Sequence, residues 1–521
     1  MSLTKSFRGP WAAVAVCSVV FGVLSYLQPY WQDTLWFWAD YHGICDEMGG
    51  PSVRAFWEYF RYEAAVDNAR VFNRMAPLIA DYLPKWLDGG LVGCMTALLF
   101  WSMGKLIGLR RDDGPLWWGL LGVMFVCLPW NNNILVPVYS LNYIYPAASS
   151  MAAVYLALQR GMWSGGGAVV LSVLGAWGHE GIGGTLLAGA VPMMLLVRRF
   201  GRYRTLYVAS ATATATAMVA FFFTNLLRRF GFETARAWMD FDTNGWLMFN
   251  FFTVGLVVFL AGCMCRRRWR LWLLEFVSEH PMAVYFFSLA VAGAILSGMM
   301  QRSYRITFWP QLCAMVVWGM VLLGSMRRYI KSIRWCVGGL VGLCAVLFAG
   351  EVWVSAQFRR TYDEACRELD RPGCSTAYIK LLHPRHFPRW FSRFTPRYMF
   401  IDYSQALFLR KVKSSEAAIV PEELRGIDTS IPTDSIVMAA GGVGYFRPSQ
   451  PIKIAFNIIG DVTTASGVHR DEPISLINFV ADDGTPLIWV QPMRFKPEEV
   501  IDVESDLSLI YTYYYFEHGL K

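Results

Sequence analysis

The sequence predicts an α-helical polytopic membrane protein of about eleven transmembrane helices, followed by a β-rich α+β domain. Its 521 residues are 55% apolar and only 17% charged, which is too apolar for an ordinary soluble protein. The apolar residues form long blocks, each near the roughly 20 residues that a bilayer-spanning helix needs. From about residue 356 the composition becomes polar. We therefore expect a membrane bundle over residues 1–355 and a separate C-terminal domain over residues 356–521.

The apolar blocks give the expected positions of the transmembrane helices. Glycine-rich stretches and the polar pair His179-Glu180 interrupt the fifth and sixth blocks. No small-x-small cleavage pattern follows the first block, so we interpret it as an uncleaved signal anchor. The expected spans cover residues 11–30, 88–107, 115–130, 143–159, 165–179, 182–197, 204–224, 246–264, 281–300, 307–325 and 335–355.

Positive charge predicts the orientation of these helices, because cytoplasmic loops carry an excess of Lys and Arg. With the N-terminus in the cytoplasm, most basic loop residues face inward, and only the outward loop after the seventh span departs from the rule. The net charge of +8 then reflects a cytoplasmic girdle that contacts membrane lipids, and it does not indicate a nucleic-acid partner. The C-terminal domain is expected on the extracytoplasmic side of a bacterial inner membrane. The inward-facing residues are Lys105, Arg110, Arg111, Arg160, Arg198, Arg199, Arg202, Arg204, Arg266, Arg267, Arg268, Arg270, Arg327, Arg328, Lys331 and Arg334.

Residues 31–86 form an unusually long connection between the first two spans, so we expect this insert to carry function. Ser52 is placed to cap a helix that begins near Val53. A second helix is expected from Asp67, with Asp67, Arg70 and Arg74 on one face, a kink at Pro77 and an end at Pro84. Both helices are expected to lie on the outer membrane surface.

The C-terminal region carries the pattern of a small β-rich domain. An amphipathic helix is expected to open near Arg359, and the segment Asp482–Thr485 is typical of a hairpin turn between two strands. Cys366 and Cys374 could close a small loop in an oxidising compartment. The expected strands cover residues 435–440, 452–459, 474–481, 487–490 and 507–516.

Asp33 is the candidate catalytic residue. It lies a few residues beyond the first span, where a carboxylate at the membrane interface could act as a general base on an acceptor hydroxyl. The alternative is that Asp33 is a helix-end residue in a hydrated loop. Cys263-x-Cys265 lacks the spacing of a metal-binding pair, and we predict no metal site.

His179 and Glu180 form the sharpest polar signal inside the predicted bundle. An ionisable pair between two apolar segments is costly there, which favours a functional role in binding acceptor or phosphate. Two alternatives remain open. The pair could make a structural contact that seals a helix break, or it could serve as a proton relay in a transporter.

Four arginines and two residues at the end of the outer loop between the third and fourth spans are candidate substrate-binding groups. Arg302 and Arg305 are three residues apart on the outer side, where guanidinium groups could bind a lipid phosphate or could anchor a span end. Arg70 and Arg74 have the same two interpretations, the second being an ion pair with Asp67. The amide of Asn142 and the phenol of Tyr143 could hydrogen-bond a sugar, although turn chemistry also explains such residues.

The order of these features resembles the GT-C superfamily of polytopic glycosyltransferases, close to a poorly characterised bacterial branch near the O-antigen glucosyltransferases. The resemblance implies a polyprenyl-phosphate sugar as donor and an acidic residue of the first outer loop as catalytic base, which corresponds to Asp33. Thr34 follows Asp33 where many members have a second acidic residue, and a divalent metal is therefore unsupported. The matching elements, in order over about 300 residues, are Asp33, Asn68-Ala69-Arg70-Val71-Phe72, Asn142-Tyr143-x-x-Pro146, Gly178-His179-Glu180 and Arg302-x-x-Arg305.

The expected function is therefore transfer of a sugar from a polyprenyl-phosphate donor to a glycan or lipid acceptor at the outer face, with no cofactor. A transporter or flippase for a lipid-linked sugar or small solute is the alternative. The odd number of spans, the lack of internal repeats and the long insert disfavour it. A non-catalytic assembly protein, with the C-terminal domain as its binding module, is a third hypothesis.

Overall fold

The computed structural model describes residues 9–30, 33–66, 69–130, 134–196, 203–222, 246–248, 250–299, 304–371, 373–380, 382, 386–391, 418–450, 456–492 and 494–507. The chain divides into two compact units. The first, which we call the bundle unit, comprises residues 1–28 and 41–352. The second, the sheet unit, comprises residues 29–40 and 353–521.

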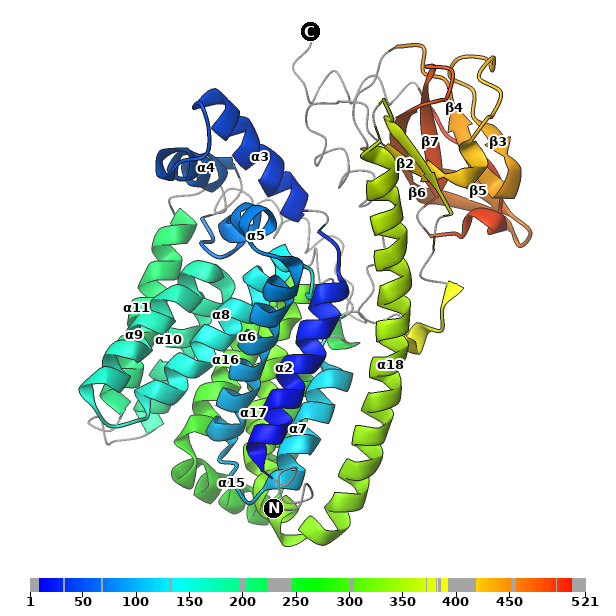
Figure 1. Ribbon diagram of the computed structural model, residues 1–521. Coiled ribbons are helices and arrows are strands. Elements are labelled where there is room, and N and C mark those ends of the chain that lie inside the picture. Colours follow the sequence, from blue (N-terminus) through cyan, green and yellow to red (C-terminus); the bar gives the residue numbers. More distant parts are fainter. Residues whose placement is uncertain are drawn as a thin grey trace, which may run out of the picture. The chain divides into compact units, whose positions relative to one another are not determined.

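The bundle unit is built of helices (Figure 1). Two further helices, α3 (Asp33–Glu47) and α18 (Ile330–Leu369), contain residues of both units. The bundle helices are α2 (Pro10–Leu27), α4 (Val53–Val66), α5 (Ala76–Tyr82), α6 (Lys85–Ile107), α7 (Gly114–Cys127), α8 (Pro137–Ala157), α9 (Met162–Gly178), α10 (Glu180–Leu196), α11 (Arg204–Phe222), α14 (Phe251–Cys265), α15 (Arg267–Glu279), α16 (Pro281–Met299) and α17 (Phe308–Arg328).

Many of these helices have the character of membrane spans. Within the described residues, six are long and apolar enough to cross a bilayer: α2, α6, α11, α16, α17 and α18. The helices α7, α10 and α14 are apolar but shorter. Every range that the sequence predicts to be a span overlaps a helix in the described part of the chain. The helical membrane character is therefore confirmed, whereas the number eleven stays a prediction.

Glycines bring α2 and α6 into close contact. Gly22 on α2 faces Gly89 and Gly93 on α6, and a Cβ atom added at Gly93 would lie only 2.2 Å from the backbone oxygen of Ser18. Small residues spaced four apart allow such an approach, which gives helices van der Waals contact that apolar lipid cannot replace. The first span is thus fixed to the second by backbone-to-backbone packing.

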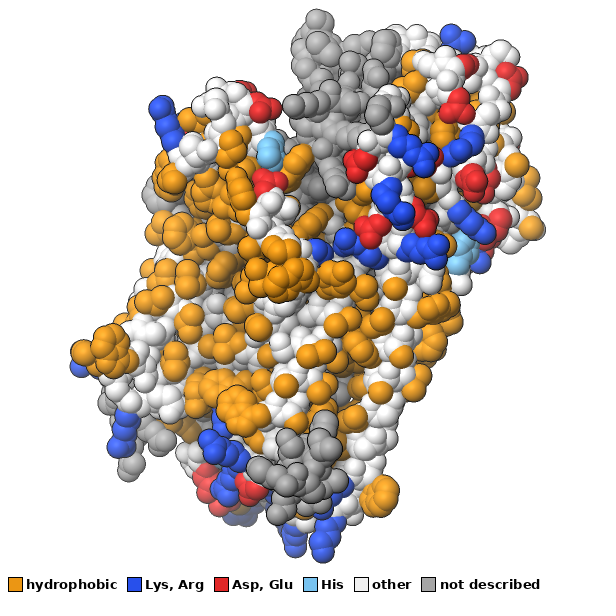
Figure 2. Space-filling view, in the orientation of Figure 1, with side chains coloured by type: hydrophobic (Ala, Val, Ile, Leu, Met, Phe, Trp, Pro, Cys, Tyr) orange, Lys and Arg blue, Asp and Glu red, His pale blue; other side chains and the backbone are white. Residues whose placement is uncertain are grey.

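The surface of the bundle unit separates apolar from basic side chains. In Figure 2 hydrophobic side chains cover the helices along their length, while Lys and Arg gather at the end of the bundle where α15 lies in Figure 1. None of the residues of α15 is buried. Exposed Leu271 and Leu274 share this helix with exposed Arg267, Arg268 and Arg270, a pattern typical of a helix at a membrane surface.

The long insert folds differently from the sequence prediction. The helix near Val53 is confirmed, and the Ser52 hydroxyl accepts a hydrogen bond from the Ala55 N–H at 3.0 Å. The helix predicted to start at Asp67 is wrong in its described part, since residues 69–72 are not helical and α5 begins only at Ala76. Pro77 occupies the first turn of α5, where its missing N–H costs nothing, so it starts a helix rather than kinking one.

The helix α18 also corrects an expectation. The last predicted span and the amphipathic helix expected near Arg359 are parts of one helix of 40 residues. Ion pairs between residues four apart continue the helix through its polar part: Arg359 with Asp363 at 3.0 Å and Arg360 with Glu364 at 2.9 Å. The change from apolar to polar composition is therefore not a break in secondary structure.

The sheet unit contains a short parallel pair and a six-stranded antiparallel sheet. The pair is β1 (Thr376–Ile379) with β2 (Ala418–Pro421). The larger sheet has the strand order β3-β4-β7-β6-β5-β8. Its strands are β3 (Val437–Ala439), β4 (Val443–Phe446), β5 (Phe456–Thr464), β6 (Gly467–Val480), β7 (Pro486–Pro492) and β8 (Val500–Glu504).

Both faces of the large sheet are buried. Alternate residues of β6 and β7 point to opposite sides, so that Ile477 and Trp489 join one apolar cluster while Leu476 and Val490 join the other. The first cluster also holds residues of β1 and β2, among them Tyr378. The small parallel pair therefore covers one face of the sheet.

The predicted hairpin between β6 and β7 is confirmed. The Ala481 N–H donates to the Thr485 carbonyl, the Gly484 N–H donates to the Ala481 carbonyl, and Gly484 takes a positive φ of 86° that suits glycine. The sequence did not reveal β1, β2, β4 or β8. The strand expected over 507–516 lies almost wholly outside the described residues. Cys366 and Cys374 do not form a disulfide with each other.

Candidate functional site

An ion pair between Arg70 and Glu180 forms the centre of the candidate site. The Arg70 Nε donates to one carboxylate oxygen of Glu180 at 2.8 Å, and Nη2 donates to the other. The two side chains are 17% and 15% exposed. Such a bidentate contact holds the guanidinium and carboxylate groups in one plane. It also joins the long insert to the start of α10, 110 residues away in the sequence. Asp67, the partner that the sequence suggested for Arg70, lies outside the described residues.

The backbone around Arg70 is fixed by the break between α9 and α10. The Val71 N–H donates to the Trp177 carbonyl at 3.1 Å, so the insert hydrogen-bonds the last turn of α9. Phe72 packs so closely on Gly178 that an added Cβ there would lie 2.4 Å from the phenyl ring. Glycine at position 178 therefore allows the insert to approach, and this approach brings Arg70 to Glu180.

His179 lies in the turn between α9 and α10 and is 7% exposed. Its ring centroid is 5.1 Å from that of Tyr143 on α8. The Gly181 N–H donates to Nδ1 at 3.1 Å, and since a protonated nitrogen cannot accept, the imidazole is neutral with its proton on Nε2. The His179–Tyr143 contact brings together two residues that the sequence indicated separately.

Arg305, like His179, contacts a tyrosine of α8. It lies in the short η3 helix (Tyr304–Thr307), and its guanidinium carbon is 3.6 Å from the ring centroid of Tyr139. Tyr139 and Tyr143 are four residues apart on α8 and thus share one face. A cation and a histidine are therefore held by successive turns of α8. Arg302 lies outside the described residues.

Arg74 is separated from this arrangement. Its side chain is completely buried and pairs with Glu63 on α4, with Nη1 to Oε2 at 2.8 Å. A buried pair of this kind is structural, because a ligand could reach Arg74 only after the insert unfolded. The prediction that Arg70 and Arg74 share one helix face is wrong, since residues 69–72 are not helical and a short 3-10 helix begins only at Asn73.

Asn142 is 5% exposed on α8, beside Tyr143 in the sequence. In the described structure its Oδ1 is buried without a hydrogen-bond partner. Asp33 is the first residue of α3 and belongs to the sheet unit. The structure describes its backbone and not its side chain. The candidate site therefore comprises Arg70, Tyr143, His179, Glu180 and Arg305.

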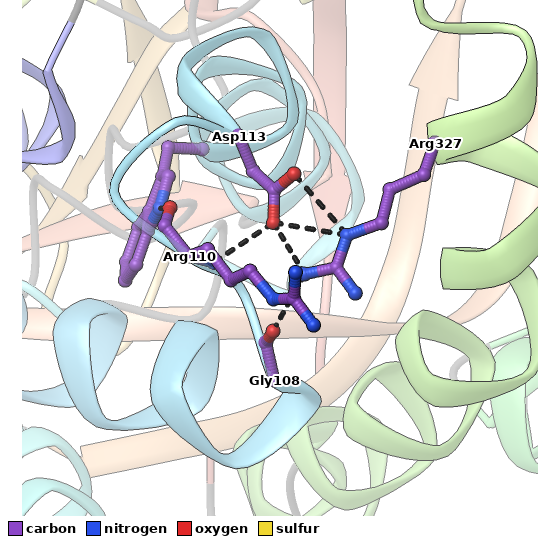
Figure 3. Close-up of polar contacts among 5 residues, drawn as sticks. Gly108, Arg110, Asp113 and Arg327 are labelled. Atoms are coloured by element: carbon purple, nitrogen blue, oxygen red, sulfur yellow. Dashed lines mark hydrogen bonds and ion pairs between the residues drawn. The ribbon is translucent and has the colours of Figure 1, made fainter.

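A second polar cluster was not predicted from the sequence (Figure 3). Arg327 donates from Nε to both oxygens of Asp113 at 3.2 Å and from Nη2 to the Gly108 carbonyl at 2.9 Å. The Arg110 N–H also donates to Asp113, at 2.8 Å. In the sequence Arg327 stands out only as part of the basic girdle, and no local signal links it to a carboxylate 214 residues away.

The charge state of Asp113 is set by these contacts. Burial raises the pKa of its carboxyl group, but the hydrogen bonds from Arg327 and from the Arg110 backbone lower it further, so that the net pKa lies below the ordinary 3.8. Asp113 is therefore ionised at neutral pH. The cluster fixes the loop between α6 and α7 to the end of α17.

Within the described residues no group of three or more His, Cys, Asp and Glu side chains is placed to hold a metal ion. Comparison with known proteins adds no relative: no family model, no curated protein and no solved structure matches this chain. The residues and their geometry are therefore the basis for assigning a function.

Proposed function

We propose that the protein is a membrane glycosyltransferase that moves a sugar from a polyprenyl-phosphate donor to a cell-envelope glycan or lipid acceptor. The observation that carries the proposal is that His179 and Arg305 contact Tyr143 and Tyr139, one turn apart on α8, while Glu180, next to His179, binds Arg70. Ionisable groups within an apolar bundle are costly and are retained for a task. Aromatic rings beside cations suit a sugar phosphate, because the rings pack on the sugar and the cations on the phosphate.

In the proposed reaction, the Asp33 carboxylate takes the proton of an acceptor hydroxyl. The acceptor oxygen then forms a bond to the anomeric carbon while the bond from that carbon to the phosphate oxygen breaks. Polyprenyl phosphate leaves with the electron pair, and the anomeric configuration inverts. Arg305, with Arg302, would hold the donor phosphate, and the neutral His179 would donate from Nε2 to the acceptor or the phosphate.

The proposal includes an orientation. Eleven spans with a cytoplasmic N-terminus would place the insert and the sheet unit on the extracytoplasmic side of a bacterial inner membrane. The charge pattern of the loops supports this orientation. The long insert, Arg305 and Glu180 would then share the outer face with a lipid-linked donor.

Replacing Asp33 by Asn tests the catalytic step. Loss of a general base lowers the rate by about 10²–10⁴-fold, so labelled sugar should no longer pass from a polyprenyl-phosphate donor to envelope acceptors in reconstituted vesicles. Asp40→Asn, in the same helix, is the matched control and should keep the activity. Full transfer by the Asp33→Asn variant would remove Asp33 as the base.

The runner-up function is transport of a lipid-linked sugar or small solute. The specific observation in its favour is the Arg70–Glu180 pair at a helix break, a place where a coupling ion or proton could act. The same vesicles distinguish the two functions. Label that crosses the bilayer without covalent transfer would favour the transporter, and transfer without crossing would favour the enzyme.

A further inference from the structure

A cavity of about 640 Å³ lies within the bundle unit, and no residue of the Arg70–Glu180 site lines it. It is bounded by α7, α14, α17 and the first part of α18, together with the end of α6. Val123, Gly255 and Trp318 are among the residues that line it. Glycine on α14 provides room, because a Cβ atom at Gly255 would meet nothing closer than 3.9 Å.

The chemistry of the lining selects the occupant. Every residue around the cavity is apolar or glycine, from Ile107 and Leu109 to Val337 and Leu340. Its volume lies within the roughly 300–1,000 Å³ of ordinary ligand pockets, yet it lacks the few polar groups that orient a polar metabolite. A hydrocarbon chain fits this environment. Since α17 and α18 have the character of membrane spans, such chains would surround the cavity.

One end of the cavity is basic. Arg110 follows the lining residue Leu109, and Arg334 follows the lining residue Ile333; both arginine side chains are exposed. Lys331, also exposed, lies half a turn before Ile333 on α18. Arg327 follows the lining residue Met326, but its charge is matched by Asp113. The cavity therefore has apolar walls and cations beyond one end, the pattern of a lipid with a negatively charged headgroup.

We propose that this cavity binds the acyl chains of an anionic diacyl phospholipid, with the lipid phosphate against Arg110 and Arg334. A zwitterionic phospholipid would offer the same chains, but it would leave the basic end without a net counter-charge. Such binding requires that the bundle unit lies in a membrane. Lipid binding does not depend on glycosyl transfer, so disproof of either proposal would not affect the other.

Photo-crosslinking tests the location. Full-length protein is placed in lipid nanodiscs that contain phosphatidylglycerol with a diazirine in one acyl chain, and the adducts are mapped by mass spectrometry. Adducts should concentrate on residues 251–255 and 333–340. Gly255→Leu, which fills the cavity, should remove them. Gly262→Leu, two turns further along the same helix, should not, because Gly262 is exposed and does not line the cavity. Val123→Trp is a second variant that fills the cavity. It is used if Gly255→Leu does not elute as the wild-type protein does and is therefore misfolded.

Competition tests the headgroup. Unlabelled phosphatidylglycerol should displace the probe about thirtyfold better than phosphatidylcholine, given about 1 kcal/mol for each of the two arginines at a membrane surface. The double variant Arg110→Ala with Arg334→Ala should bring the two lipids to equal potency, while Arg160→Ala leaves the preference intact. Adducts spread evenly over all lipid-facing helices would overturn the site. Equal competition in the wild type would overturn the headgroup assignment, and stronger displacement by a polyprenyl phosphate would overturn the choice of lipid.

Discussion

At the scale of single residues, the pairing of arginines decides the local structure of the insert. Arg70 and Arg74 are four residues apart, yet they bind Glu180 and Glu63, on two different helices. Each carboxylate is well removed from water, so each pair exists only if its geometry offsets the loss of hydration. Breaking one partner leaves the other charge buried, and this asymmetry makes the pairs testable.

Glu180→Gln should destabilise the protein by about 3–5 kcal/mol, because the mostly buried Arg70 would lose the carboxylate that it binds with both Nε and Nη2. The measurement is the thermal midpoint in detergent. The double variant Arg70→Ala with Glu180→Ala should lose less than the sum of the single changes. Arg61→Ala is the control, because the Arg61–Glu58 pair has a 74% exposed arginine and should contribute little. Additive losses at Arg70 and Glu180 would contradict the pairing.

Asp113 gives a pH dependence whose sign can be worked out. Its pKa is lowered in the folded protein, so the ionised form contributes stability above the ordinary pKa of 3.8, and this contribution is lost as the pH falls through the lower, folded value. Asp113→Asn should therefore be less stable than wild type at pH 7. The difference between the two thermal midpoints should shrink below pH 3.8. A difference that stays constant with pH would show that Asp113 acts through packing.

At the scale of elements, hydrophobic blocks predict helices well because a long apolar run satisfies its own backbone only as a helix in a membrane. The break at His179 was predicted and lies between α9 and α10. The helix predicted to begin at Asp67 is wrong for the opposite reason. There the Val71 N–H binds a distant partner, the Trp177 carbonyl, which local periodicity cannot reveal.

The candidate site was likewise predicted only in part from the sequence. His179 and Glu180 stand out in the sequence because charged residues are rare in apolar blocks. Tyr139, the partner of Arg305, was missed, although its spacing of four from Tyr143 is a signal that a search for aromatic pairs on one helix face could have found. The pairing of Arg70 with Glu180 could not be predicted, since nothing local relates residues 110 apart.

The glycine contact between α2 and α6 predicts an element-scale effect. Gly93→Ala should separate the helices, because its Cβ would overlap the backbone oxygen of Ser18, which cannot rotate away. We expect a loss of about 1–3 kcal/mol or more, measured as a lower thermal midpoint. Gly90→Ala in the same helix is the matched control, since nothing lies within 4 Å of its Cβ position. An unchanged midpoint for Gly93→Ala would contradict the close packing of α2 on α6.

At the scale of the whole molecule, the proposed orientation makes a parity prediction. An odd number of spans puts the two termini on opposite sides of the membrane. In a cysteine-free background, Ala465→Cys in the exposed turn between β5 and β6 should react with a membrane-impermeant maleimide from outside intact cells. Arg160→Cys, between α8 and α9, should react only after permeabilisation. Labelling of both positions from outside would rule out the proposed arrangement.

The Asp113–Arg327 cluster in Figure 3 also sets an order in time. The two residues are 214 apart in sequence. At a synthesis rate of about 5–20 residues per second, Asp113 is synthesised roughly 10–40 s before Arg327 exists. During that interval the carboxylate has no arginine and must remain hydrated, so the loop after α6 cannot reach its final position. Closure of this end of the bundle is therefore a late event in biogenesis, coupled to the arrival of α17.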